Sequence, residues 1–299
     1  HIGGGVYGEW HYYGLFNEPD ASNSMRRRFA EFAADRFRTI AEVNLRWKTS
    51  FSDFSDIVVP SYDRRGQVSD GEFRDPRDDQ YVIDFYVCLQ ETISHLVDDL
   101  AKIAKEVWPR PVITGVFYGY FYGGFTVGAI AGQNDIETIF RSPHIDYVAG
   151  PYFSRSMLGS GMFRSLAESA ALNGKIWMTE HDGGTHLGSS GRGDAKFPDI
   201  PETEAQTVAR MRRNFMYSLT ERGGQWWYDF GPRSAGGGWW STPRLLREAG
   251  ELLKLSQTLM ERPYEKKADV LVVHSMASYY YHRPKISEKA TKMANASKN

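Results

Sequence analysis

Two glutamates occupy positions at which a parallel α/β barrel keeps its catalytic groups. Glu9 ends the stretch that opens the chain, and Glu180 follows the apolar run 176–179. Catalytic side chains of such barrels lie at the carboxyl ends of the strands. Two carboxyl groups across a barrel mouth suit the cleavage of a glycosidic bond, because a neutral one protonates the leaving oxygen while an ionised one attacks the anomeric carbon. The pair alone does not establish this chemistry, since any barrel carries acidic residues at strand ends.

Polar and aromatic side chains near the same strand ends are candidates for binding a sugar. Aromatic residues make up 14% of the chain, and an aromatic ring offers a flat apolar face to the C–H groups of a pyranose. The alternative for each candidate is packing in the core or at its rim. We also expect Trp239 and Trp240 on a flexible loop, where burial is less expected and where they can form a lid or a subsite wall. The candidates for substrate binding are His11, Tyr118, Tyr120, Asp182, Trp226, Trp227 and Asp229.

The sequence gives no support to a metal, nucleotide or serine-hydrolase site. His181, Asp182 and His186 have a spacing loosely like that of metal ligands, but no further strong ligand accompanies them. The run 188–191 does not match the G-x-S-x-G elbow, and there is no glycine-rich nucleotide loop. Cys88 is the single cysteine, which excludes a disulfide framework, and we expect it buried and inert within a helix. We therefore expect neither a metal nor a cofactor.

The charge balance and the hydropathy of the chain narrow the partners that it can have. It has 299 residues, with 36 basic and 37 acidic side chains and a formal net charge of -1. No sustained basic block is present, which argues against nucleic acid or an anionic membrane as the main partner. No apolar run approaches the roughly 20 residues of a membrane span. We expect a soluble globular protein whose partner is a carbohydrate.

Apolar periodicity predicts strands that alternate with helices, which implies a parallel sheet with the helices outside it. The polar run 50–80 reads as a long surface loop between two helices. We expect helices over 24–48, 80–107, 136–140, 160–172, 203–222 and 243–260, and strands over 112–120, 145–152, 175–179 and 225–230.

Both ends of the chain suggest that flanking segments are missing. The chain opens at His1 with what reads as the end of a strand, so we expect a true N-terminus upstream; the alternative is a processed mature end, and the localisation stays open. We expect a catalytic domain over 1–262, followed over 263–299 by a linker and the start of a truncated C-terminal α/β domain. Val270–Val273 would be its first strand. A homo-oligomer can form through that domain.

Several segments resemble the glycoside hydrolase family 42 β-galactosidases. Ile2-Gly3 followed by Gly8-Glu9-Trp10 is similar to the family's I-G-x4-N-E-aromatic segment, and 43–51 is similar to its L-N-x2-W-x-T-x-F run. The stretch 54–60 resembles the family's next segment after that run, and Trp177-Met178-Thr179-Glu180 resembles the strand that carries the nucleophile. Together with 114–121, the residues 8–14 are most similar to uncharacterised β-galactosidase-like proteins of the same clan. The likeness covers most of residues 1–275.

The resemblance implies a fold and an activity. The fold is part of a (β/α)8 TIM barrel, its strands four to eight, with Glu9 on the fourth and Glu180 on the seventh. The activity is the retaining hydrolysis of β-galactosides, with Glu9 as the acid/base and Glu180 as the nucleophile. Apolar neighbours such as Trp10 would raise the pKa of Glu9 for this role.

Two departures from the family pattern keep other interpretations open. The family's Asn before the acid/base, which would contact the sugar 2-hydroxyl, is Gly8 here. If the segments correspond as described, the first three barrel strands are absent, and the sheet is then not closed and has open edges. The alternatives are a clan A glycosidase that acts on another β-linked sugar, and a non-catalytic carbohydrate-binding barrel.

Glu18 is a rival for the acid/base. Asn17-Glu18-Pro19 resembles the N-E-P tripeptide of many cellulase-like barrels in the same clan. For Glu18 to end a strand, that strand would have to run through residues 12–16, which Gly14 interrupts. We therefore favour Glu9 and interpret Glu18 as a loop residue near the start of the next helix.

Overall fold

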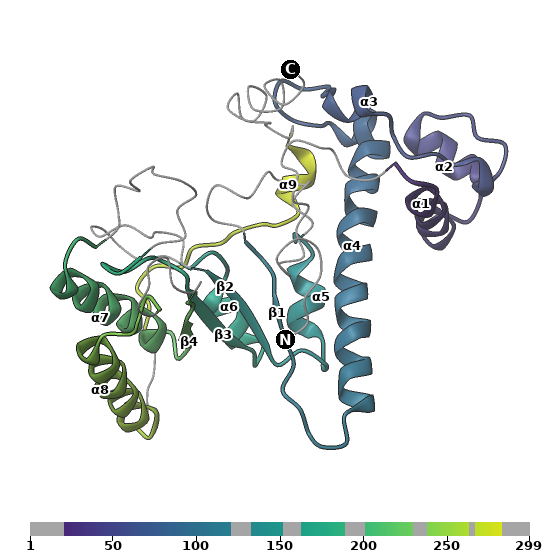
Figure 1. The fold of residues 1–299 in the computed structure, drawn as a ribbon. Helices are drawn as coiled ribbons and strands as arrows, with labels where there is room; N and C mark the ends of the chain where they lie inside the picture. Colours follow the sequence, from purple (N-terminus) through teal and green to yellow (C-terminus); the bar gives the residue numbers. More distant parts are fainter. Residues whose placement is uncertain are drawn as a thin grey trace. The chain divides into compact units, whose positions relative to one another are not determined.

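The computed structural model describes residues 21–120, 133–151, 163–188, 201–229, 238–262 and 267–282. They divide into two compact units, one from 1–144 with 273–299 and the other from 145–272. Glu9, His11 and Glu18 lie outside the described residues. Figure 1 labels the helices and strands of both units.

The described part of the first unit is mostly helical. The helix predicted over 24–48 is two helices, because Phe37 ends the first in extended backbone and the side chain of Thr39 caps the second. The predicted loop over 50–80 contains short helical segments. The long helix begins at Pro76, with Asp75 as its N-cap. The elements are α1 (Asn23–Arg36), α2 (Ile40–Trp47), η2 (Phe54–Asp56), α3 (Tyr62–Gly66), α4 (Pro76–Val107), β1 (Gly115–Phe117), α5 (Ile136–Arg141) and α9 (Ser278–Tyr281).

Aromatic side chains form the core where α1, α2 and α4 meet. The rings of Phe29 and Trp47 stack with centroids 4.9 Å apart, and Phe85 approaches Phe29 edge-on at 5.7 Å. Trp47 Nε1 donates to the buried Asp84 Oδ2 over 2.7 Å, which satisfies the indole within this core. Cys88 is buried beside them, as predicted, and burial raises the pKa of its thiol to about 12.

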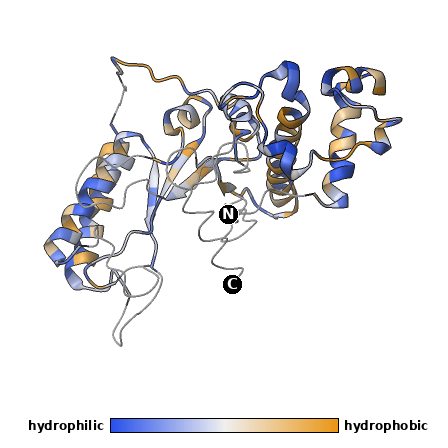
Figure 2. Cartoon of the chain, turned by 90° about the horizontal axis from the view of Figure 1, so that it is seen from above, coloured by the Kyte–Doolittle hydropathy of each residue, from blue (hydrophilic) through white to orange (hydrophobic). Residues whose placement is uncertain are grey.

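The apolar side chains of the long helix α4 are buried only in part. Val97 and Ala101 are fully buried, whereas Leu96, Leu100 and Ile103 are exposed. Figure 2 shows that the long helices carry both apolar and polar residues. The apolar periodicity therefore predicted the position of the helix, but it did not show which of its apolar side chains are buried within the described residues.

The second unit alternates strands with helices, as predicted. Its strands are neighbours in the order β2-β3-β4, and both pairings are parallel. Helices α7 and α8 lie side by side (Figure 1) and pack through a small apolar cluster that includes Met211, Phe215 and Leu245. The elements are β2 (Tyr147–Pro151), α6 (Ala167–Leu172), β3 (Ile176–His181), α7 (Glu204–Thr220), β4 (Gly224–Trp227) and α8 (Pro243–Met260). The predicted α/β class with parallel strands is confirmed.

The strand predicted over Val270–Val273 is wrong. These residues form no strand, and their side chains are exposed, with Leu271 at 86%. A β-branched run has high strand propensity, but a strand needs a partner edge, and the described residues supply none there. The predicted domain boundary at residues 262 and 263 stays a prediction. Within the described part of the chain, no helix is both long and apolar enough to cross a bilayer.

Candidate functional site

Glu180 lies within β3, one residue before its end, with a parallel strand on each side. Its register partners are Pro151 on β2 and Trp226 on β4. The strand extends to His181, so Glu180 is part of the strand rather than the first residue after it. The side chain of Glu180 is only 9% exposed. A carboxyl group is thus held, nearly buried, at the carboxyl end of a parallel sheet.

The two faces of the sheet have different surroundings. Side chains alternate along a strand, so Glu180 and Trp226 share one face, and Thr179, His181 and Trp227 share the other. Helix α7 covers the second face, where Ser218 Oγ donates to Thr179 Oγ1 over 3.2 Å. Glu180 and Trp226 therefore point away from α7, and Trp227 does not share their face.

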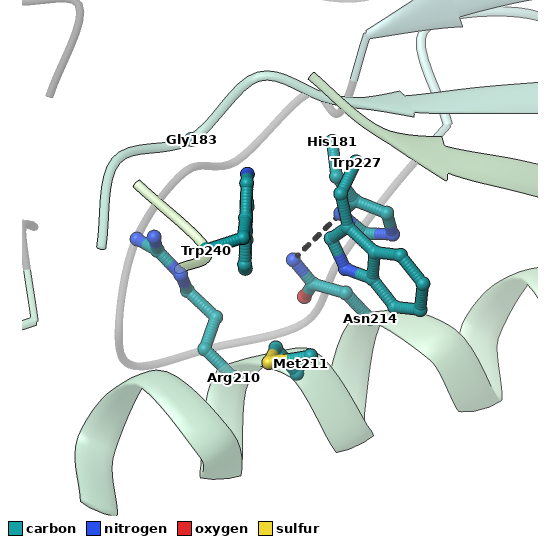
Figure 3. A pocket seen from close by; sticks show the side chains of 7 residues that line it. All are labelled: His181, Gly183, Arg210, Met211, Asn214, Trp227 and Trp240. Atoms are coloured by element: carbon teal, nitrogen blue, oxygen red, sulfur yellow. Dashed lines mark hydrogen bonds between the residues drawn. The ribbon is translucent and has the colours of Figure 1, made fainter. Parts of the chain in front are cut away.

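Polar side chains hold His181 against α7. Its Nε2 lies 2.9 Å from Gln225 Oε1, and its Nδ1 lies 3.4 Å from Asn214 Nδ2. Desolvation by burial lowers the pKa of His181 to about 4, so the ring is neutral at pH 7. Figure 3 shows this small pocket, which is lined by His181, Gly183, Arg210, Met211, Asn214, Trp227 and Trp240.

The loops that follow β3 and β4 pack against each other. Thr185 Oγ1 donates to the carbonyl oxygen of Trp239 over 2.6 Å. The Trp239 ring lies so close to Gly188 that a Cβ at residue 188 would be 2.7 Å from it. Trp239 lies in a turn outside any helix or strand but is 1% exposed, so the expectation that it is not buried is wrong. Trp240 is partly exposed, and its Nε1 donates to the Tyr228 carbonyl oxygen over 3.0 Å.

Tyr118 and Tyr120 follow β1 in the first unit, and both are buried. The backbone N–H of Tyr120 donates to Gln133 Oε1 over 2.8 Å. Burial raises the pKa of the Tyr118 hydroxyl well above its usual value. Their burial agrees with the alternative that both side chains pack in the core. A contact of either ring with sugar stays a prediction.

The remaining candidates lie around the ends of β3 and β4. Asp182 follows β3 directly and is buried, and its charge acts on the neighbouring His181 ring. Asp229 is exposed just after β4, where Gly238 approaches it so closely that a Cβ at residue 238 would be 2.0 Å from its Oδ2. Trp226 is the candidate that the register brings beside Glu180. The binding roles of these residues stay predictions.

Asn214 and Gln225 were not among the residues predicted from the sequence. A signal for Asn214 was present, because it is a polar residue on the face of α7 that also carries Met211 and Phe215. His186, which sequence spacing grouped with His181, instead contacts Thr207 Oγ1 with its Nδ1 at 3.0 Å. Among the residues that the structure describes, no three His, Cys, Asp or Glu side chains converge as metal ligands would.

Comparison with known proteins gives two matches. The model of the glycoside hydrolase family 42, described as beta-galactosidase, matches residues 10–184. Beta-galactosidase BbgII of Bifidobacterium bifidum is 36% identical over 75 residues, which cover 22% of this chain and 10% of that protein. The chain thus spans about a tenth of the length of this curated relative. Because the family match covers more than half of the chain and includes Glu180 with its strand, the chain belongs to glycoside hydrolase family 42.

Proposed function

We propose that the chain carries the catalytic glutamates of a retaining glycoside hydrolase that cleaves β-galactosides. Glu180 is the nucleophile, and Glu9 is the acid/base. The observation that carries the proposal is the position of Glu180, nearly buried at the carboxyl end of a parallel strand inside the segment that matches the family. The name of the relative, beta-galactosidase, supports the choice of sugar.

The proposed barrel rests on the same likeness. Strands β2, β3 and β4 are then the sixth, seventh and eighth of a (β/α)8 barrel, and residues 1–262 belong to it. Side chains that point into such a barrel come from one face of the sheet, and Glu180 and Trp226 share a face opposite α7. That arrangement supports a site on the Glu180 face.

The first step forms a covalent glycosyl-enzyme. An oxygen of the ionised Glu180 carboxylate bonds to the anomeric carbon while the bond from that carbon to the glycosidic oxygen breaks. The electron pair of that bond stays on the leaving oxygen, which takes a proton from the neutral Glu9 carboxyl group. This step inverts the configuration of the anomeric carbon once.

The second step releases the sugar. Glu9, now a carboxylate, takes a proton from water as the water oxygen bonds to the anomeric carbon and the bond to Glu180 breaks. A second inversion restores the starting anomeric configuration, and both carboxyl groups return to their first protonation states. This chemistry requires the two carboxyl groups to be about 5–5.5 Å apart.

Trp226 is suited to bind the sugar beside the nucleophile. Neighbouring strands are about 4.8 Å apart, and Trp226 is the register partner of Glu180 on β4. Trp226 is therefore the residue of β4 whose backbone lies nearest to Glu180, and its indole extends from the same face of the sheet. A pyranose attacked by Glu180 can lay its C–H face on this ring.

Hydrolysis of aryl β-galactosides by the chain and its Glu180→Gln variant tests the proposal. We expect the wild type to release the aryl group with retention, seen by NMR as a β-configured first product, and Glu180→Gln to lose turnover by about 10⁴-fold or more. Azide should restore part of the activity of Glu180→Ala, because it can enter the vacated volume as a nucleophile.

A matched control is Glu251→Gln, an exposed glutamate on α8 in the same unit. It should keep wild-type activity. Aryl β-glucosides and β-mannosides assayed in parallel test the sugar. Wild-type turnover in Glu180→Gln, or an inverted first product, would overturn the proposal.

A further inference from the structure

The ring of His181 is fixed at both nitrogens. Asn214 Nδ2 can only donate, so Nδ1 of His181 must accept its hydrogen bond at 3.4 Å. The proton of the neutral ring is then on Nε2, which donates to Gln225 Oε1 over 2.9 Å. The two amides therefore select one tautomer and one orientation of the imidazole.

Two further contacts hold the same residue. The His181 ring stacks on Trp227, with centroids 6.2 Å apart and planes at 23°. The backbone carbonyl oxygen of His181 accepts a hydrogen bond from the N–H of Tyr228 over 2.9 Å, beyond the end of β4. His181 is thus held through its backbone and its ring, by residues of α7 and of the β4 segment.

The charged groups that act on His181 come from two segments. Asp182, next in the chain, favours the protonated ring, whereas Arg210 and Arg213 on α7 disfavour it. Strand β4 presents Gln225 and Trp227, neither of which titrates. Burial outweighs the carboxylate and lowers the pKa of the ring, which agrees with a neutral imidazole that donates from Nε2.

We infer that His181 is a positioning residue that fixes the direction of the Glu180 side chain through their shared peptide unit. The inference rests on the proposed function of Glu180. Side chains alternate along β3, so a ring anchored on the face covered by α7 sets the Cα–Cβ direction of the residue before it on the opposite face. A displacement of about 1 Å at a reacting group costs about 10²-fold in rate.

Loss of the anchor should lower kcat more than it raises KM, because the sugar still meets the same surface while the nucleophile is displaced. We expect kcat of His181→Ala to fall about 10- to 100-fold with little change in KM. His181→Gln keeps an amide donor towards Gln225 and should recover part of that loss. His186→Gln is the control, because His186 lies in the loop that follows β3 and contacts Thr207.

The isosteric variant Asn214→Asp separates positioning from packing. A carboxylate at residue 214 accepts where the amide donated, so His181 keeps both ring contacts only when it is doubly protonated. We expect kcat of Asn214→Asp to be near the wild-type value at low pH and to fall as pH rises through the new, raised pKa of His181. Asn214→Ala should be impaired at every pH.

The experiment measures kcat and KM of the full chain and these variants against pH with an aryl β-galactoside, and the His181 tautomer from its ¹⁵N shifts. In the wild type we expect the proton of the neutral His181 ring on Nε2 and none on Nδ1. A proton on Nδ1, or wild-type kcat and pH profiles in both His181→Ala and Asn214→Asp, would overturn the positioning role alone. A wild-type chain without hydrolytic activity would overturn the proposed function as well. If His181→Ala does not fold, Asn214→Asp still decides the question.

Discussion

Gly188 is a position at which one added methyl group should disturb the loop that follows β3. An ideal Cβ at residue 188 would lie 2.7 Å from both Cδ1 and Nε1 of Trp239. The indole has little room to move away, because it is 1% exposed and the Trp239 carbonyl accepts the Thr185 hydroxyl. Gly188→Ala must therefore shift either the loop or the ring.

The size of the effect is set by two opposing contributions. Overpacking of a filled site costs about 1–3 kcal/mol. Replacing glycine by alanine also restricts the unfolded chain, which stabilises the fold by about 0.4–1 kcal/mol. We therefore expect Gly188→Ala to lower the free energy of unfolding by about 1–2 kcal/mol.

Urea unfolding followed by tryptophan fluorescence measures this change. The matched control is Gly250→Ala in α8, where an added Cβ meets nothing within 4 Å. That substitution should raise the free energy of unfolding by up to about 1 kcal/mol, because alanine is the better helix former. Equal stability of the two variants would refute the close packing of Trp239 on Gly188.

Three further predictions concern side chains elsewhere in the two units. Asp84→Ala removes the acceptor of the buried Trp47 indole and should cost about 1–3 kcal/mol in urea unfolding. Folding lowers the pKa of His181 from 6.5 to about 4, so the unfolded chain binds a proton at a higher pH than the folded chain does. The free energy of unfolding should therefore fall as the pH drops from 6.5 to 4, and His181→Gln should weaken this pH dependence. Arg212→Ala breaks an ion pair with Glu248 in which the arginine is largely exposed, and calorimetry should show little change in stability.

Local sequence signals were enough to predict helices α7 and α8 of the second unit. Helix α8 was predicted over 243–260 and forms over Pro243–Met260, because Thr242 caps it and proline suits its first turn. Helix α7 starts after a complete capping box, in which Thr203 and Gln206 satisfy each other's backbone groups. Where start signals and periodicity agree, the sequence alone defines the element.

Tertiary contacts decided the features that were not predicted. Apolar periodicity over 24–48 did not reveal the break between α1 and α2, where Phe37 has extended backbone and Thr39 caps the second helix. Val270–Val273 has strand propensity without a strand. The anchor of His181 joins residues 33 and 44 positions apart in sequence, a separation that no local pattern reports. The place of Glu180 near the end of a strand was predicted because strand propensity and family likeness both pointed to it, and its role as nucleophile stays a proposal.

Covalent trapping tests the central claim most directly. The full chain is incubated with an activated 2-fluoro β-galactoside, which forms the glycosyl-enzyme but slows its hydrolysis, and is then digested and mapped by mass spectrometry. We expect a sugar adduct on the peptide that contains Glu180, and none in Glu180→Gln. An adduct on another carboxyl group, such as Asp182 or Glu18, would contradict it.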